Sequence, residues 1–399
     1  MLIQLSELET IILALVALFL GRLVRAGVPW LKRIDLPDAV VGGLLLALLA
    51  LFARLAFGVE VAFGSHLRDI LLLVFFSTIG LSAKLSALAA GGRPLLILCA
   101  VTLLLIALQN LVGAAVAIAW GAHPFYGLLA GGLSFVGGPG TALAWAREAE
   151  AAGLEAAQAV GIGAATLAVI AGALLAGPAA GYLIRRKDLR PAAASAPAAA
   201  PTAATPLQDY GVAGVLVALL LIAVAVYLGE KINQLARGNG LMLPGFLTAM
   251  LAGVALANGA DALRVRVDLR PIATGGEAAL KIFLAMSLMS MPIAAMSAVI
   301  LPLGVNVVAQ ILVIGAVAYF LLFPLLGRDY DAAVTTAGFV GFGIASMPVA
   351  MATMDEVTKR HGPSPKAFLI VTLAGAFFVD LANATVAKLF LMLPLFGMG

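Results

Sequence analysis

The sequence predicts an all-α integral membrane protein whose helices form two inverted five-helix repeats, each with a re-entrant hairpin. Three observations support this fold class. Hydrophobic residues make up 63% of the 399 residues and charged residues only 11%, unlike the composition of a soluble domain. Apolar runs long enough to cross the hydrocarbon core of a bilayer recur along the chain. Glycine-rich segments interrupt the two halves at corresponding places, about 205 residues apart.

The predicted transmembrane helices number about ten, or about five in each half of the chain. Their apolar runs cover residues 8–26, 38–58, 68–88, 94–120, 156–184, 210–229, 244–259, 274–297, 299–326 and 366–395. The runs within residues 1–184 form the N-terminal repeat, and those within residues 210–399 form the C-terminal repeat. Because Glu7 and Glu9 stand where a signal peptide would be basic, we expect the first run to be a retained helix.

An Ala/Pro-rich linker, residues 185–209, connects the two repeats and is expected to be an extended cytoplasmic segment. Its first residues, Arg185, Arg186 and Lys187, are basic, and basic loops favour the cytoplasmic side of a membrane. This orientation places both termini on the outer side of the membrane and most other basic loop residues on the cytoplasmic side. Because each half crosses the membrane an odd number of times, the second repeat starts on the opposite side from the first and is inverted relative to it. The predicted location is the bacterial inner membrane, and the net charge of +4 requires no nucleic-acid partner.

The glycine-rich interruptions are predicted to be re-entrant hairpins at about residues 125–150 and about residues 332–353. A full crossing at the first of them would put the basic linker on the outer side. Gly131-Gly132, Gly137-Gly138, Pro139 and Gly140 interrupt the first segment, and the glycines predicted at the two hairpin tips are Gly137, Gly138, Gly140, Gly341 and Gly343. Broken helices at membrane depth present free amides to anionic groups and free carbonyls to sodium, which indicates the substrate site of a secondary transporter. Close packing of helices on small residues is the alternative interpretation.

Polar residues inside the apolar runs form the second part of the predicted site, because each is costly in lipid. Asp380 is the carboxylate placed clearly within a helix, and Asn383 follows on the same helical face. This pair is the candidate sodium site; it could also accept the ammonium group of an amino acid or carry a proton. A structural ion pair between Asp380 and Lys388 is the alternative.

Further polar candidates lie in both halves, with Gln109 and Asn110 at a place similar to that of Gln310. They are Thr78, Gln109, Asn110 and Thr141 in the first half, and Gln310 and Ser346 in the second. Interhelical hydrogen bonds worth less than about 1 kcal/mol each are the alternative explanation for several of these residues. Glu277 and Lys281 are spaced as an intrahelical ion pair and are not assigned to the site.

Ordered matches to a known family run through both halves. The matching segments are Gly42-Gly43-Leu44-Leu45, Phe75-Phe76-Ser77-Thr78-Ile79-Gly80-Leu81, Gln109-Asn110, Gly137-Gly138-Pro139-Gly140-Thr141, Tyr330-Asp331-Ala332-Ala333, Gly341-Phe342-Gly343 and Gly375-Ala376-Phe377-Phe378-Val379-Asp380. On these residues the chain resembles the glutamate:sodium symporter family over essentially its whole length. The resemblance implies inverted repeats with opposed re-entrant loops, a homodimer in the lipid bilayer, and sodium-driven uptake of L-glutamate by an elevator-like movement.

The hairpins depart from the family pattern mainly by losing polar side chains. The departures are Val136, Pro139 and Ala142 in the first hairpin, and Phe339, Met347, Val349 and Thr353 in the second. A site with fewer hydrogen-bonding partners discriminates less among substrates. The leading hypothesis is sodium-coupled symport of L-glutamate or a related acidic amino acid. The alternative keeps the fold but uses proton coupling, another small carboxylate or a neutral amino acid.

An enzyme is not expected, because no Gly-x-Ser-x-Gly or His-Glu-x-x-His motif occurs and no second intramembrane aspartate accompanies Asp380. Cys99 is the single cysteine, which excludes an intrachain disulfide and a thiolate metal cluster. We expect no cofactor; the expected coupling ion is Na+.

Overall fold

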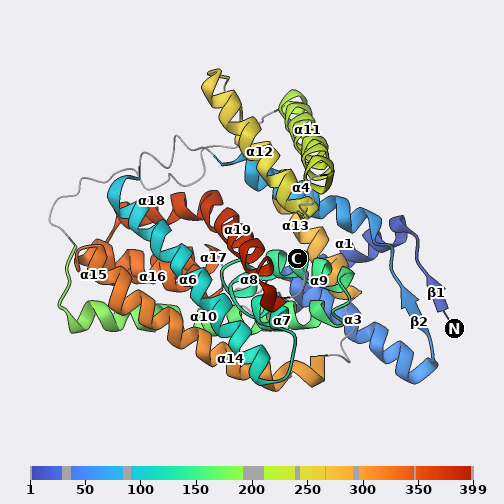
Figure 1. Cartoon of the computed structure of the whole chain (residues 1–399), viewed down its shortest axis with the longest axis horizontal. Coiled ribbons are helices and arrows are strands. Elements are labelled where there is room, and N and C mark those ends of the chain that lie inside the picture. The colour runs from blue at the N-terminus through green and yellow to red at the C-terminus, as the bar shows by residue number, and fades with distance from the viewer. Residues whose placement is uncertain are drawn as a thin grey trace. The chain divides into compact units, whose positions relative to one another are not determined.

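The computed structural model describes residues 2–28, 37–83, 91–191, 211–238, 243–265, 267–290, 296–345 and 347–396. The chain divides into two compact units, each of which combines segments from both halves of the sequence (Figure 1). Unit 1 comprises Met1–Lys32, Leu36–Leu85 and Gln208–Ala295, and unit 2 comprises Arg33–Asp35, Ser86–Leu207 and Met296–Gly399. Each compact unit therefore contains helices from both of the repeats that the sequence predicts.

The described helices of unit 1 are α1 (Glu7–Gly27), α3 (Asp38–Phe57), α4 (His66–Leu81), α11 (Gly211–Gly238), α12 (Gly245–Ala262) and α13 (Leu269–Met289). α1 packs on α3, α4 packs on α12 and α13, and α11 packs on α12. Glycines allow close approach: a Cβ added at Gly42 would lie 1.7 Å from the Ala17 carbonyl oxygen, so the backbones of α1 and α3 touch. Small residues at helix interfaces are typical of membrane helices.

A short parallel strand pair departs from the predicted all-α fold. β1 (Leu2–Gln4) precedes α1 and pairs with β2 (Glu60–Ala62), which follows α3. Both strands lie outside the helices, where strand pairing satisfies backbone groups that no helix satisfies. The Glu7 carboxylate next to β1 accepts hydrogen bonds from the backbone N–H groups of His66 and Leu67, which ties α1 to the start of α4. The all-α prediction is wrong for these two segments.

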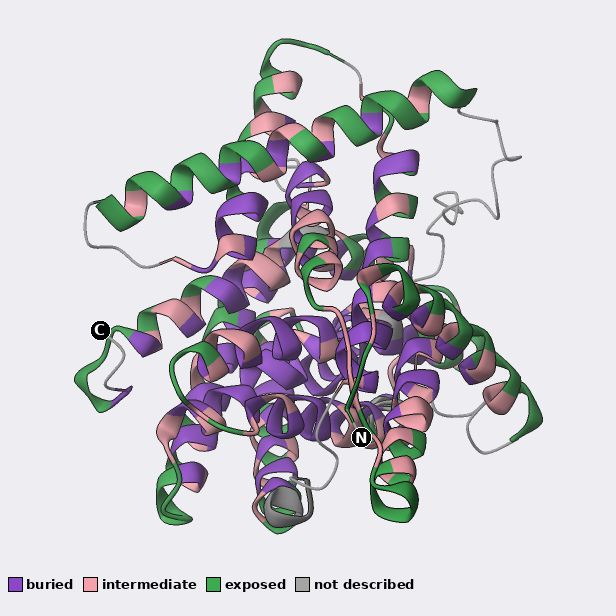
Figure 2. Cartoon of the chain, turned by 90° about the vertical axis from the view of Figure 1, so that its right-hand side faces the viewer, coloured by how far each residue is buried: buried purple, intermediate pink, exposed green. Residues whose placement is uncertain are grey.

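Unit 2 contains both glycine-rich interruptions. Its described helices are α6 (Gly92–Ala119), α7 (Pro124–Leu129), α8 (Gly132–Phe135), α9 (Gly138–Ala151), α10 (Ala157–Arg186), α14 (Met296–Ala316), the π-helical η2 (Val317–Leu322), α15 (Phe323–Leu325), α16 (Tyr330–Ile344), α17 (Met347–His361), α18 (Pro365–Leu373), the π-helical η3 (Ala374–Phe378), α19 (Val379–Leu391) and η4 (Pro394–Phe396). All residues of α16 except Asp331 are buried. Figure 2 colours the buried residues of the chain purple. A helix that is apolar and buried on every side lies in the core of its unit.

Seven of the described helical segments are long and apolar enough to cross a membrane. They are α1, α3, α6, α11, α12, α13 and Leu301–Leu325, which continues α14 through η2 and α15. α4 overlaps the predicted run of residues 68–88 but has only 16 residues, from His66 to Leu81. α10 and the joined α18, η3 and α19 occupy the other predicted positions. That about ten helices cross the membrane stays a prediction.

Candidate binding site at the hairpin breaks

Two helical hairpins of unit 2 contain the predicted hairpin glycines. The first hairpin consists of α7, α8 and α9, and the second of α16 and α17. Both hairpins pack against α10, and α8 contacts α16, so the two hairpins are neighbours within the unit. The helices break at residues 130–131 and 136–137, and α16 ends before Ala345; Ser346 lies outside the described residues. The first hairpin therefore contains two breaks, at the two glycine pairs Gly131-Gly132 and Gly137-Gly138 that interrupt its sequence.

Two asparagines hold the break between α7 and α8. Asn110 on α6 accepts a hydrogen bond from the Gly132 backbone N–H through Oδ1, at 3.0 Å. Asn383 on α19 donates from Nδ2 to the Gly132 carbonyl oxygen at 2.8 Å. A Cβ added at Gly132 would lie 3.0 Å from Asn110 Oδ1 and 3.3 Å from Asn383 Oδ1, so a glycine fits closely between the two amides. One residue from each half of the chain thus fixes the same glycine.

A chain of amide side chains leads from the first hairpin to the second. Asn306 on α14 donates from Nδ2 to the Ala130 carbonyl oxygen at the end of α7. Gln310, one turn further along α14, donates to the Gln109 carbonyl oxygen at 2.9 Å. The Gln109 side chain in turn donates to the Gly343 carbonyl oxygen at 2.9 Å. Buried side chains therefore satisfy backbone groups freed at both hairpins, as a dry environment requires.

Four amide atoms of this network have no hydrogen-bond partner among the described residues. They are Gln109 Oε1, Asn110 Nδ2, Gln310 Oε1 and Asn383 Oδ1, all on side chains that are fully buried. A buried polar atom without a partner costs about 1–3 kcal/mol, so several such atoms on the side chains that hold the hairpins point to a ligand. The three oxygens suit a cation or an ammonium group, and the amide N–H2 suits a carboxylate.

The start of α9 adds backbone N–H groups close to Asn383. Gly137 occupies the N-cap position of α9 and has no side chain that could cap the helix. Gly138, the first residue of α9, adopts a left-handed φ of 69°. A Cβ added at Gly137, the residue before α9, would lie 2.6 Å from Asn383 Nδ2, so the start of α9 lies against this side chain. Gly140 and the buried Thr141 lie in the first turn. Uncapped N–H groups and the positive end of the helix dipole attract anions.

Asp380 lies on α19 one turn before Asn383 and directly after η3. Its side chain is half-buried, and neither Lys388 nor any other basic side chain of the described residues forms an ion pair with it. Within the described ranges, no three His, Cys, Asp or Glu side chains gather as a metal site. A cation bound here would therefore be held by one carboxylate together with amide and backbone oxygens, which are hard ligands.

The other predicted residues take different places. Gly341 and Gly343 lie in the last turn of α16 and not in the break itself, and a Cβ at Gly341 would lie 2.5 Å from Ala350 Cα on α17. Gly341 thus allows the two helices of the hairpin to pack closely. Thr78 belongs to α4 of unit 1, where its hydroxyl donates to the Phe75 carbonyl oxygen at 2.7 Å. The predicted intrahelical pair between Glu277 and Lys281 is confirmed, with a separation of 2.5 Å.

Asn306 is the site residue that the sequence analysis missed. It is 2% exposed and links α14 to the end of the first hairpin. The signal was present, because Asn306 precedes Gln310 by one helical turn and both amides lie in an otherwise apolar run.

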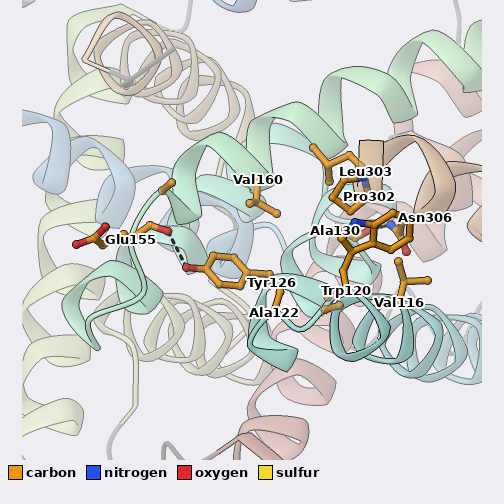
Figure 3. A pocket seen from close by; sticks show the side chains of 14 residues that line it. Val116, Trp120, Ala122, Tyr126, Ala130, Glu155, Val160, Pro302, Leu303 and Asn306 are labelled. Carbon is orange, nitrogen blue, oxygen red and sulfur yellow. Dashed lines mark hydrogen bonds between the residues drawn. The ribbon is translucent and has the colours of Figure 1, made fainter. Parts of the chain in front are cut away.

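A cavity of about 330 Å³ lies beside the first hairpin, between α6, α7, α10 and α14 (Figure 3). Its walls are mostly apolar and include Trp120, Val160 and Leu303, with Tyr126 and Asn306 among the polar lining residues. The orphaned amide atoms belong to none of its lining residues. The cavity therefore borders the candidate site at Asn306 and Ala130, but the orphaned amide atoms do not line it.

Long apolar helices, two broken hairpins and buried amides at their breaks define a multi-pass membrane protein of the secondary-transporter class. Comparison with known proteins narrows the class: the sodium/glutamate symporter family model matches residues 3–363. The chain is 38% identical over 402 residues to a sodium/glutamate symporter of Escherichia coli strain K12, covering 99% of each chain. It is 35% identical over 397 residues to one of Haemophilus influenzae, covering 96% of each. The chain belongs to the sodium/glutamate symporter family, whose members are transporters and not enzymes.

A solved structure with a weaker similarity is that of a sodium proton antiporter from Methanocaldococcus jannaschii. It shares 16% sequence identity with the chain, with a TM-score of 0.45, and the match covers 96% of this chain and 97% of the other.

Proposed function

We propose that the protein is a sodium-coupled symporter of L-glutamate or a related acidic amino acid, and that both ligands bind at the hairpin breaks of unit 2. The observation that carries this proposal is the group of buried, partnerless amide atoms beside the uncapped start of α9. Such a site offers oxygen atoms for cations and N–H groups for carboxylates in one place.

In this proposal the sodium ion is bound by Asp380 and the Oδ1 atom of Asn383. Sodium is a hard cation that takes oxygen ligands, and Asp380 supplies the negative charge that a dry cation site needs. The face shared by Asp380 and Asn383 on α19 supports the assignment. Gln109 Oε1 and Gln310 Oε1 are further candidate ligands for sodium or for the substrate ammonium group.

The substrate carboxylate is proposed to bind the start of α9. Its partners would be the backbone N–H groups of Gly138 and Gly140, the Thr141 hydroxyl and Asn110 Nδ2. The helix dipole favours an anion at this position by about 0.3–1 kcal/mol, and by up to about 2 kcal/mol in a favourable, partly buried geometry. Gly343, whose carbonyl is held by Gln109, would bring the second hairpin to the same site.

The division into two units supports an elevator-like mechanism. Unit 2 holds both hairpins and the buried amides, so it would carry the ligands, while unit 1 would form the fixed scaffold of a homodimer in the lipid bilayer. The same proposal keeps the predicted topology: two inverted repeats with re-entrant hairpins in a bacterial inner membrane, both termini outside and the linker of residues 185–209 inside.

Uptake into proteoliposomes tests the proposed function. Purified protein should accumulate labelled L-glutamate against its gradient when sodium is high outside, and replacing sodium by potassium should stop accumulation. Competition by aspartate, succinate and leucine then ranks the substrate classes. Accumulation driven by a proton gradient in sodium-free buffer, or stronger competition by succinate or leucine than by glutamate, would favour the alternative ion or cargo. Failure to accumulate any of these compounds would contradict the proposal.

A further inference from the structure

The base of the first hairpin is closed by a tyrosine. Tyr126, in the first turn of α7, donates from its hydroxyl to the Glu155 carbonyl oxygen at 2.7 Å (Figure 3). Glu155 lies in the connection between α9 and α10, after the hairpin has returned. The bond therefore joins the segment that enters the hairpin to the segment that leaves it.

The base of the second hairpin is closed in the same way. Tyr330, the first residue of α16, donates from its hydroxyl to the Gly362 carbonyl oxygen. Gly362 lies in the connection between α17 and α18, again after the hairpin has returned. A second bond reinforces this base, since the Ser364 hydroxyl donates to Asp331 Oδ1 at 2.6 Å.

The two tyrosines have equivalent partners in the two halves of the chain. Each acceptor is a backbone carbonyl, which any residue supplies, so the bond depends on the tyrosine and on the path of the hairpin. Burial, assisted by Asp331, raises the pKa of Tyr330 to about 12, and burial likewise raises the pKa of Tyr126. Both hydroxyls therefore stay protonated and able to donate at physiological pH.

We infer that Tyr126 and Tyr330 are positioning residues that fix the depth of the two hairpin tips by fastening the hairpin bases. α16 has 15 residues and is thus about 22 Å long, so a small tilt at its base displaces the far end, where Gly343 meets Gln109. The inference rests on the proposed function in one respect: the tips are taken to bind the ligands.

The two hairpin bases differ in how much they depend on the tyrosine hydrogen bond. Tyr126 lines the cavity of about 330 Å³, so α7 has space to move once its hydroxyl bond is lost. Tyr330 is 3% exposed, and its hairpin keeps the Ser364–Asp331 bond when the tyrosine hydroxyl is removed. Loss of the Tyr126 hydroxyl is therefore expected to loosen its hairpin more.

Hydrogen–deuterium exchange and uptake kinetics of Tyr126→Phe and Tyr330→Phe test the inference. Each variant removes one hydroxyl and keeps the ring. Tyr319→Phe is the matched control, because Tyr319 lies in η2 of the same unit and its hydroxyl has no hydrogen bond among the described residues. Exchange should rise in residues 124–151 for Tyr126→Phe and, less strongly, in residues 330–361 for Tyr330→Phe. The control should match the wild type.

In sodium-driven uptake, both variants should raise the KM for sodium or substrate about two- to tenfold, the effect of one lost neutral hydrogen bond, while kcat changes less. Raised exchange with an unchanged KM would overturn the positioning role, and so would unchanged exchange. A fall in kcat and thermal stability alone would show a merely structural role. If the wild type transports nothing, the proposed function fails, whereas the exchange result still decides whether the tyrosines fasten the hairpins.

Discussion

Asn383 shows how one residue can both build a site and leave an atom free for a ligand. Its Nδ2 group donates to the Gly132 carbonyl, which fixes the orientation of the amide, and its Oδ1 atom is then left without a partner. A purely structural asparagine in a buried position would be expected to use both ends of its amide. The same argument applies to Asn110, whose Oδ1 is used and whose Nδ2 is not.

Replacing Asn383 by alanine should abolish or strongly weaken sodium-dependent uptake and lower the free energy of unfolding by about 1–3 kcal/mol. Asn233→Ala is the matched control, because Asn233 is also buried and donates to a backbone carbonyl, that of Leu243 in unit 1. Thermal unfolding and uptake should be measured on both. If both variants lose transport in proportion to their stability, Asn383 has a structural role only.

Asp380→Asn should abolish sodium-driven uptake and leave folding intact, because it removes the charge and nearly preserves the shape of the side chain. Asp355→Asn on α17 makes the same chemical change at an exposed ion pair with Lys359 and should leave uptake near that of the wild type. Uptake assays with a sodium titration check both. Transport at the wild-type rate and sodium affinity in Asp380→Asn would remove Asp380 from the ion site.

At the scale of elements, two glycines of the hairpins differ in their surroundings, which supports a proposed binding role for one and a packing role for the other. Gly138 begins α9 with a left-handed φ of 69°, which a residue with a Cβ adopts only with strain. Gly341 instead lies within α16 and lets the backbone of α17 approach. Both arise from the same glycine-rich sequence signal, which does not distinguish a binding glycine from a packing one.

Gly138→Ala should reduce transport much more than it reduces stability, since the strain of about 1 kcal/mol falls on the peptide proposed to meet the substrate. Gly315→Ala on α14 is the control, because no atom lies within 4 Å of an added Cβ there, and it should be neutral or stabilising by up to about 1 kcal/mol. Substrate-binding affinity and thermal stability should be measured together. Equal losses of affinity in both variants would contradict a binding role for Gly138.

Gly42→Ala should destabilise unit 1 by several kcal/mol, because the added methyl would lie 1.7 Å from the Ala17 carbonyl oxygen and would force α1 and α3 apart. Gly259→Ala on α12, where no atom lies within 4 Å, serves as the control. Thermal unfolding in detergent measures the difference. A Gly42→Ala protein as stable as the wild type would show that the interface between α1 and α3 can separate freely.

For the whole molecule, hydropathy predicted the helical character and the positions of most long helices, because lipid requires apolar side chains and internally satisfied backbones. The local glycine and proline pattern located the helix breaks near residues 137 and 345. Sequence reasoning could not predict that compact units mix the two halves, since that depends on contacts between distant helices. It also missed β1 and β2, which lie outside the helices, and Asn306, whose partner Ala130 is remote in sequence.

The residue types of the candidate site were predictable from the sequence, but their hydrogen-bond partners were not. Polar residues in apolar runs identified Gln109, Asn110, Gln310 and Asn383, yet nothing in their spacing showed which backbone groups they hold. Only the three-dimensional contacts reveal which amide atoms are used and which remain free. That distinction carries the proposed function.

Location of the bound ligands by cryo-electron microscopy, with saturating sodium and L-glutamate, is the most direct test of the account. We predict substrate density at the start of α9, within hydrogen-bonding distance of the Gly138 and Gly140 backbone, and an ion between Asp380 and Asn383 Oδ1. Density for the substrate away from both hairpins, for example among the helices of unit 1 alone, would contradict the account.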